Sequence, residues 1–203
     1  MGYCFMAFEK IKTSKEFSGK FSHNFRTMDV PNADSKLYYL NEELIKMPEG
    51  ETYESICKKK IKDAPGYEER RPRKDAVRGL EFVLAYNPRT VDKDFDEERW
   101  KEENVKWLQD TFGKENVISA VLHKDEPADS PHIHAVVIPM VDGRLNAKHY
   151  TGGKKAVSEL QTSYGKYMDR VGLERGIQFS HAKHKDIKRF YGAIEKVINQ
   201  DLP

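Results

Sequence analysis

Two runs rich in β-branched residues stand on either side of a short polar segment in the second half of the chain, and this feature constrains the fold most. The runs are residues 116–124 and 131–141. Apolar, β-branched runs separated by a few turn-forming residues predict a β-hairpin. The chain must therefore build a sheet that contains an antiparallel pair, and other segments must cover that sheet.

The remaining segments predict an α+β fold. Residues 2–11 carry apolar side chains at both alternating sets of positions, which is typical of a buried strand. A second strand is expected at residues 77–86, and a short extended segment or turn at residues 35–40. Helices are predicted at residues 51–62, 94–112, 153–171 and 184–199. This order favours one domain, residues 1–203, in which helices pack mainly on one face of an antiparallel sheet.

Length and composition exclude several classes of protein. No apolar run approaches the ~20 residues that cross a bilayer. The N-terminal segment turns charged at Glu9, which is too early for a secretory signal. Cys4 and Cys57 lie far apart and form neither a metal-binding nor a redox spacing. We therefore expect a reduced, cytoplasmic protein with no membrane contact within these residues.

Charge is distributed unevenly along the chain. The net charge is only +2, yet residues 58–78 and 143–189 are strongly basic and residues 92–103 are acidic. Two interpretations remain open. The basic stretches form a surface that follows a phosphate backbone, with the acidic stretch on the opposite side, or each stretch is an ordinary solvated helix face.

Three of the seven histidines fall within the predicted hairpin. His132 and His134 stand two residues apart in a strand, so their side chains point to the same face. If the turn centres on Ala128 and Asp129, His123 lies opposite His134 and shares that face. A shift of one residue would send His123 to the other face, so the prediction depends on the register of the hairpin.

Three converging imidazoles form an open metal site, with positions left for water or a substrate oxygen. The alternative is a group of surface histidines near a turn, but a His-x-His pair plus a third histidine across the hairpin favours the metal. Asp125, Glu126 and Asp129 lie in the same turn and can orient a ligand or complete the shell. Imidazole ligands favour Zn, Mn, Fe, Co or Ni over Mg. We expect a divalent ion, with Mn²⁺ favoured and Mg²⁺ or Zn²⁺ as alternatives.

Several segments resemble, in the same order, those of the MobV relaxases, also called the Mob/Pre family of plasmid mobilisation proteins. They are His23-Asn24-Phe25-Arg26, Leu40-Asn41-Glu42-Glu43-Leu44, Arg73-Lys74-Asp75-Ala76-Val77, His123-Lys124-Asp125-Glu126 with Pro131-His132-Ile133-His134, and Ala182-Lys183-His184-Lys185. The resemblance spans most of the chain. It implies the fold of the HUH endonucleases, in which an antiparallel sheet carries the metal and helices lie behind it.

The resemblance also implies an activity. Such enzymes nick one strand at a plasmid's origin of transfer, a DNA hairpin with adjoining single strand, and stay attached to the 5′ end. Many HUH enzymes use a tyrosine as nucleophile, whereas this family is expected to use the histidine that corresponds to His23. Tyr38 and Tyr39 are alternative nucleophiles, although we expect them to pack in the sheet.

The chemistry of a histidine nucleophile can be argued independently. A neutral imidazole nitrogen can attack phosphorus and form a phosphoramidate, which the free 3′ hydroxyl can reverse. The metal would polarise the scissile phosphate. Glu126 would hold His23 in one tautomer, accept its proton or act as a fourth ligand. We favour a role outside the metal shell, although Glu126 stands two residues further from His132 than is usual in the family.

The phosphate contacts expected for the DNA are Arg26, Arg73, Lys74 and Lys148, each of which has the alternative of being a solvated side chain without a role. Family members usually carry a longer C-terminal region, so any homodimer is expected to form through a region outside these residues. Two other functions remain open: a rolling-circle replication initiator of the HUH class, and a non-catalytic DNA-binding regulator with a structural metal. A metal hydrolase of small molecules is disfavoured by the basic stretches.

Overall fold

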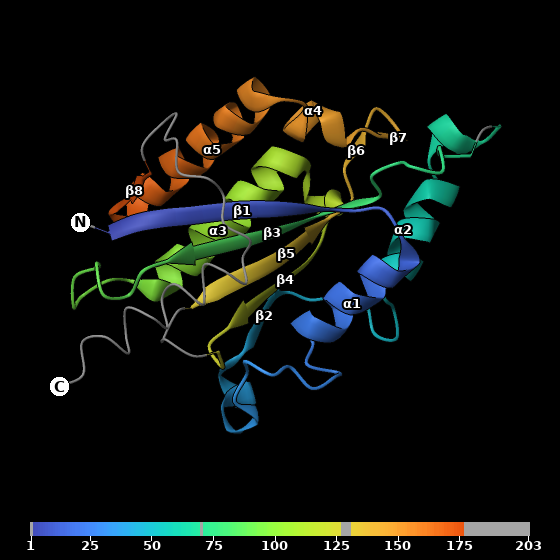
Figure 1. Cartoon of the computed structure of the whole chain (residues 1–203). Helices are drawn as coiled ribbons and strands as arrows, with labels where there is room; N and C mark the ends of the chain where they lie inside the picture. The colour runs from blue at the N-terminus through green and yellow to red at the C-terminus, as the bar shows by residue number, and fades with distance from the viewer. Residues whose placement is uncertain (1, 70, 127–130, 177–203) are drawn as a thin grey trace.

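A six-stranded sheet forms the centre of the computed structural model, which describes residues 2–69, 71–126 and 131–176 (Figure 1). Its strand order is β2-β4-β5-β3-β1-β8. The strands are β1 Gly2–Ile11, β2 Glu42–Ile45, β3 Gly79–Tyr86, β4 Val117–His123, β5 His132–Val137 and β8 Leu173–Arg175. Neighbouring strands are antiparallel, except that β8 runs parallel to β1. A separate two-stranded sheet joins β6 (Met140–Val141) to β7 (Arg144–Leu145).

Helices cover the two faces of the sheet unequally. The α-helices are α1 Ser14–Asn24, α2 Tyr53–Lys62, α3 Glu97–Phe112, α4 Ala147–Thr151 and α5 Lys154–Met168. The 3₁₀ helices are η1 Ser35–Leu40, η2 Pro65–Tyr67, η3 Lys114–Asn116 and η4 Asp169–Val171. The two longest, α3 and α5, lie on one face, while α1 and α2 lie on the other side, toward one end of the sheet (Figure 1). The α+β fold, with helices mainly on one face, is confirmed.

The alternation of side chains along the strands creates two apolar cores. Leu80, Phe82 and Leu84 of β3 face the helix pair α3 and α5, where Trp107 packs edge-on against Tyr164. On the opposite face, a smaller cluster gathers under α1 and α2; it comprises Ile11, Phe17, Tyr53, Cys57, Ile118, Val136 and Ile138. The second core leaves part of its face to polar side chains, and these form the site described below.

The first helix begins with a local sequence signal. The Thr13 hydroxyl accepts a hydrogen bond from the backbone N–H of Glu16, and the Glu16 carboxylate accepts one from the backbone N–H of Thr13. This reciprocal capping box satisfies two N–H groups that a helix start leaves unpaired. Phe17 then points into the smaller core, where it is 1% exposed, and so fixes which face of α1 meets the sheet.

Most predicted elements are confirmed, with differences at their ends. The strand at 2–11 and the helices at 51–62, 94–112 and 153–171 are present as β1, α2, α3 and α5. Of the two alternatives for residues 35–40, an extended segment or a turn, the structure shows turns, which form the 3₁₀ helix η1. Tyr39 is 79% exposed rather than packed in the sheet. The sequence patterns missed α1, β2, β7, α4 and β8. The helix predicted at 184–199 lies outside the described residues.

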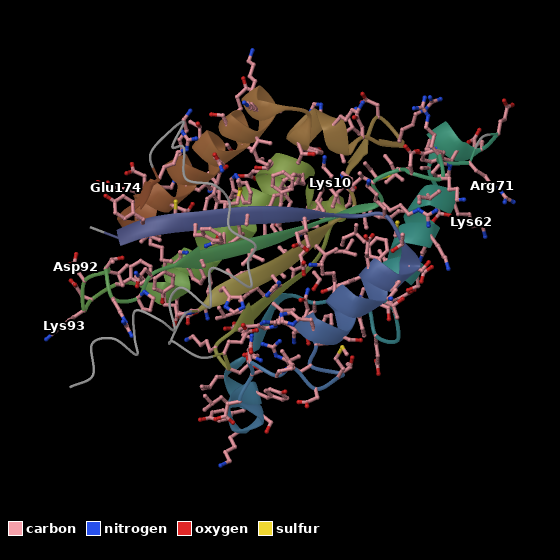
Figure 2. The ribbon with its side chains drawn as sticks, viewed as in Figure 1. Lys10, Lys62, Arg71, Asp92, Lys93 and Glu174 are labelled. Atoms are coloured by element: carbon pink, nitrogen blue, oxygen red, sulfur yellow. The ribbon has the colours of Figure 1, made fainter. Side chains whose placement is uncertain are left out.

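Residues from the basic stretch 58–78 and from the stretch 92–103 lie at different ends of the molecule. Figure 2 shows Lys62 and Arg71, from the basic stretch 58–78, near α2, and Asp92 and Lys93, at the start of the acidic stretch, at the far end.

Among the described residues, no helix combines the length and apolar character that crossing a membrane requires.

Candidate active site

Three histidines gather on the polar part of the sheet face that α1 borders. His132 and His134 alternate with Ile133 on β5, so both point away from the larger core. His123, the last residue of β4, pairs with His132, not with His134 as predicted. The predicted register was therefore wrong by two residues. Because side chains alternate with period two, a two-residue difference keeps His123 on the same face.

The three imidazoles form a compact, buried group. Their ring centroids are 5.4 Å apart for His123 and His132, 4.9 Å for His123 and His134, and 5.0 Å for His132 and His134. Burial, followed by repulsion from the neighbouring imidazoles, lowers the pKa of both His123 and His134 well below the ordinary histidine value. Both rings are therefore neutral at physiological pH, the form that binds metals.

Two of these imidazoles, His123 and His134, are held by a hydrogen bond at one ring nitrogen. His134 Nδ1 lies 3.2 Å from Oε1 of Glu81, a carboxylate on β3 that is only 2% exposed. His123 Nε2 lies 3.0 Å from the backbone oxygen of Asn24 at the end of α1. A carboxylate or carbonyl partner holds the proton on that nitrogen and leaves the other with its lone pair.

A fourth imidazole comes from α1. His23 stands in the last turn of this helix, and its ring centroid is 4.9 Å from that of His134 and 5.5 Å from that of His123. Its side chain is 33% exposed, so it borders the solvent while the other three are buried. Burial lowers the pKa of His23, and the nearby Glu126 carboxylate only partly opposes this effect. The sequence patterns alone did not predict this juxtaposition.

Arg26 connects α1 to the carboxylates that follow β4. Its guanidinium donates two parallel hydrogen bonds to Asp125, from Nε to Oδ2 at 2.7 Å and from Nη2 to Oδ1 at 2.6 Å. It also donates to Oε1 of Glu126 at 2.8 Å and to the backbone oxygen of His23 at 2.9 Å. Nη2 further lies 3.1 Å from His123 Nδ1. The Arg26 backbone has φ +51°, a left-handed conformation that turns the chain sharply after the helix.

The carboxylates at the end of β4 differ in their partners. Burial opposes ionisation of Asp125, but hydrogen bonds from Arg26 and Asn41 outweigh it, so the pKa of Asp125 lies below its ordinary value. Glu126 presents one oxygen, Oε1, to three imidazoles. This oxygen lies 3.6 Å from His23 Nε2 and 3.8 Å from both His123 Nδ1 and His132 Nε2.

These donors suit a divalent transition-metal ion. Two overlapping sets have their ligand atoms close enough together for one ion: His23, His123 and His134, and His123, Glu126 and His132. The predicted trio His123, His132 and His134 spans both sets. Buried imidazole ligands favour a transition-metal ion such as Zn²⁺ over Mg²⁺, and the carboxylate oxygen beside them also suits Mn²⁺. The residues present therefore fit the predicted ion.

The predicted DNA contacts lie in different surroundings. Arg73 and Lys74 are exposed in the segment between η2 and β3, and Lys148 is exposed on α4. Arg26, in contrast, has a side chain only 5% exposed and bonded to protein groups, so its position differs from that of the surface phosphate contact that we expected.

Glu81 and Asn24 are site residues that the sequence reasoning missed. Glu81 is buried within a strand that otherwise reads Gly-Leu-x-Phe-Val-Leu-Ala-Tyr, and a charge in such a run was the available signal. Asn24 donates from Nδ2 to Glu81 Oε1 at 3.3 Å and to the hydroxyl of Tyr53 at 3.1 Å. Asn24 gives no comparable signal, because its role depends on the docking of α1.

Comparisons with known proteins give a consistent result. Residues 1–192 match the profile of a family described as plasmid recombination enzyme, Mob/Pre. A 65 kDa protein of Zymomonas mobilis is 34% identical over 98% of this chain, which covers 34% of that protein. A plasmid recombination enzyme type 3 of Staphylococcus aureus is 28% identical over 94% of this chain and 48% of its own length. The chain thus spans between a third and a half of these relatives.

Solved structures agree with the sequence matches. The relaxase domain of MobM, crystallised with Mn and with origin-of-transfer DNA of plasmid pMV158, superposes with a TM-score of 0.80 at 28% identity. The match covers 94% of this chain and 99% of that domain. Fold, sequence profile and the histidine site agree, and this chain belongs to the Mob/Pre family of plasmid recombination enzymes.

Proposed function

We propose that this chain is a metal-dependent relaxase domain of the HUH type that nicks and rejoins one DNA strand at a plasmid's origin of transfer. Family membership and the DNA-bound MobM domain support the choice of substrate. One observation carries the chemistry: His23, a partly exposed imidazole, lies 4.9 Å from the ring of the buried His134 and beside Glu126. This places a nucleophile next to a group of metal ligands, as in-line attack on a bound phosphate requires.

His23 is the proposed nucleophile. Glu126 Oε1 lies 3.6 Å from its Nε2, and the Arg26 guanidinium lies 3.5 Å from the same nitrogen. We assign the proton to Nε2, facing Glu126, which leaves the lone pair on Nδ1. In the reaction, Nδ1 attacks phosphorus, a nitrogen–phosphorus bond forms, and the bond from phosphorus to the 3′ oxygen breaks. The proton on Nε2 passes to Glu126 and from there, directly or through water, to the leaving 3′ oxygen. The reverse sequence rejoins the strand.

His123, His132 and His134 would hold the ion, with Glu126 beside them. A divalent ion bound there supplies positive charge that polarises the phosphate and offsets the charge developing on the leaving oxygen. Arg26 holds Glu126 in place through its 2.8 Å hydrogen bond, and we assign it this orienting role instead of a direct phosphate contact. Arg73, Lys74 and Lys148 remain the proposed phosphate contacts, since their ammonium and guanidinium groups are exposed.

A cleavage assay tests the proposal. The chain is incubated with Mn²⁺ and a supercoiled plasmid that carries the DNA flanking its own gene, then denatured with detergent. We expect relaxed plasmid and a covalent protein–DNA adduct with the wild type, and no adduct with His23→Ala, although that variant still binds Mn²⁺. His149→Ala, which removes an exposed histidine on α4, serves as the control and should behave as the wild type.

The adduct itself separates the competing nucleophiles. A phosphoramidate is labile in acid, whereas a phosphotyrosine linkage survives it, so acid treatment should release the DNA. An acid-stable adduct, or an adduct of normal yield in the His23→Ala variant, would refute the assignment of His23. Binding of the plasmid without relaxation would favour a non-catalytic regulator instead.

A further inference from the structure

Lys20 lies one helical turn before His23 on α1 and makes contacts that the proposed chemistry does not use. Its ammonium nitrogen is 2.5 Å from Oε2 of Glu81 on β3, and it also contacts Glu9 on β1. The Lys20 side chain is 28% exposed, whereas that of Glu81 is 2% exposed. A buried carboxylate on the sheet is thus neutralised by the helix that carries His23.

Glu81 shares its two oxygens between α1 and β5. Oε2 receives Lys20, while Oε1 lies 3.2 Å from His134 Nδ1 and accepts a hydrogen bond from Asn24 at 3.3 Å. Lys20 and Asn24 are four residues apart, so they flank His23 on the side of the helix that faces the sheet. One carboxylate therefore contacts both a histidine of the metal group and the helix of the nucleophile.

We propose that Lys20, acting through Glu81, is a positioning residue that sets the distance between His23 and His134. This inference rests on the proposed function, because it assigns Lys20 a part in the same reaction. An ion pair with one partner buried holds its geometry, and loss of Lys20 leaves Glu81 on the sheet without this cationic partner. Displacing a reacting group by about 1 Å can cost on the order of a hundredfold in rate.

A direct phosphate contact is the rival interpretation, because Lys20 is basic and partly exposed. Its ammonium, however, is already paired with two carboxylates, Glu9 and Glu81. A lysine that neutralises a phosphate releases a counterion, and its loss lowers the slope of binding affinity against salt by about one unit. An anchoring lysine leaves that slope unchanged, so a salt titration separates the two.

The test compares Lys20→Met with Lys15→Met, which removes an exposed positive charge from the same helix. The rate of adduct formation is measured in a single turnover, at saturating DNA and Mn²⁺, together with the dissociation constant for the DNA. We expect Lys20→Met to slow the reaction by about 10- to 100-fold, with DNA affinity within twofold and an unchanged salt slope. Lys15→Met should match the wild type. A wild-type rate in Lys20→Met, or a lowered salt slope, would overturn the inference.

A double-mutant cycle shows whether Lys20 acts through Glu81. The rates of Lys20→Met, Glu81→Gln and the double variant are compared, and the double variant should be no more than twofold slower than Glu81→Gln alone. If the rate loss of the double variant equals the product of the two single losses, Lys20 does not act through Glu81. If circular dichroism shows Lys20→Met unfolded, Lys20→Gln replaces it, since the amide keeps a hydrogen-bond donor without the charge. If His23→Ala is inactive and Lys20→Met is fully active, this inference alone is refuted. If His23→Ala is active, the proposed function is refuted.

Discussion

Arg26 is the residue that joins the nucleophile's helix to the carboxylates after β4. Its paired hydrogen bonds with Asp125 bring together two side chains that are 5% and 0% exposed. A bidentate pair between guanidinium and carboxylate resists exchange with water and fixes direction as well as distance. Because the same guanidinium also reaches Glu126 and the backbone of His23, it holds the proposed proton acceptor beside the proposed nucleophile.

Removing this guanidinium should destabilise the protein strongly. Arg26→Ala leaves the Asp125 carboxylate buried without its charged partner, which typically costs about 3–5 kcal/mol. We expect a loss of this size in the free energy of unfolding, measured by urea denaturation in the absence of metal. Arg99→Ala, an exposed arginine on α3, is the matched control and should change it by less than about 0.5 kcal/mol. Equal stability of the two variants would show that the network around Arg26 is not rigid.

At the scale of elements, α1 completes the site that the histidines of β4 and β5 begin. The helix brings His23, Asn24 and Lys20 to the sheet, and Phe17 docks it against the smaller core. Its signal was local and present in the sequence, since Thr13-x-x-Glu16 is a capping-box pattern. The helix was missed because its apolar positions are few: Phe17 and Phe21 are separated by polar residues and an isolated glycine.

The capping box should contribute measurably to stability. Thr13→Ala removes the oxygen that accepts the N–H of Glu16, and the loss of such a cap costs about 1 kcal/mol. Thermal or urea denaturation measures this loss. Ser18→Ala, at an exposed position in the middle of the same helix, should be neutral or slightly stabilising because alanine has the higher helix propensity. If both variants behave alike, the start of α1 does not depend on its cap.

At the scale of the whole molecule, two apolar cores of unequal size pack against opposite faces of the sheet. The larger one, built on α3 and α5, holds the sheet together, and the smaller one occupies only part of the opposite face. The remaining part of that face carries buried imidazoles and carboxylates in place of an apolar core. An ion bound there should therefore stabilise the entire fold.

Thermal denaturation with Mn²⁺ measures this coupling. At a concentration one hundred times the dissociation constant, a ligand that binds only the folded state adds about 2.7 kcal/mol, or roughly 5–10 °C in Tm for a chain of this length. We expect this rise for the wild type and for His149→Ala, and its loss for His132→Ala. A full Mn²⁺-dependent rise in His132→Ala would exclude His132 from the metal site.

Sequence reasoning succeeded where the information was local. Alternation of side chains in a strand put His132 and His134 on one face, and parity kept His123 with them although the predicted register was two residues off. Ordered motifs then pointed to His23. Glu81 was not found, because a charge in an apolar strand indicates a buried partner but not which residue that partner is. Arg26 was expected at the surface, because nothing in the chain near residue 26 reveals the carboxylates of residues 125 and 126.

The sequence by itself determined the periodic features: most of the strands and helices, the shared face of the histidines and the family of the chain. Only the tertiary structure decided which helix approaches that face, with His23 beside His134 and Lys20 on Glu81. The physical reason is range. Periodicity and capping depend on neighbours within a few residues, whereas these contacts join segments 60 to 110 residues apart and exist only once both cores have packed.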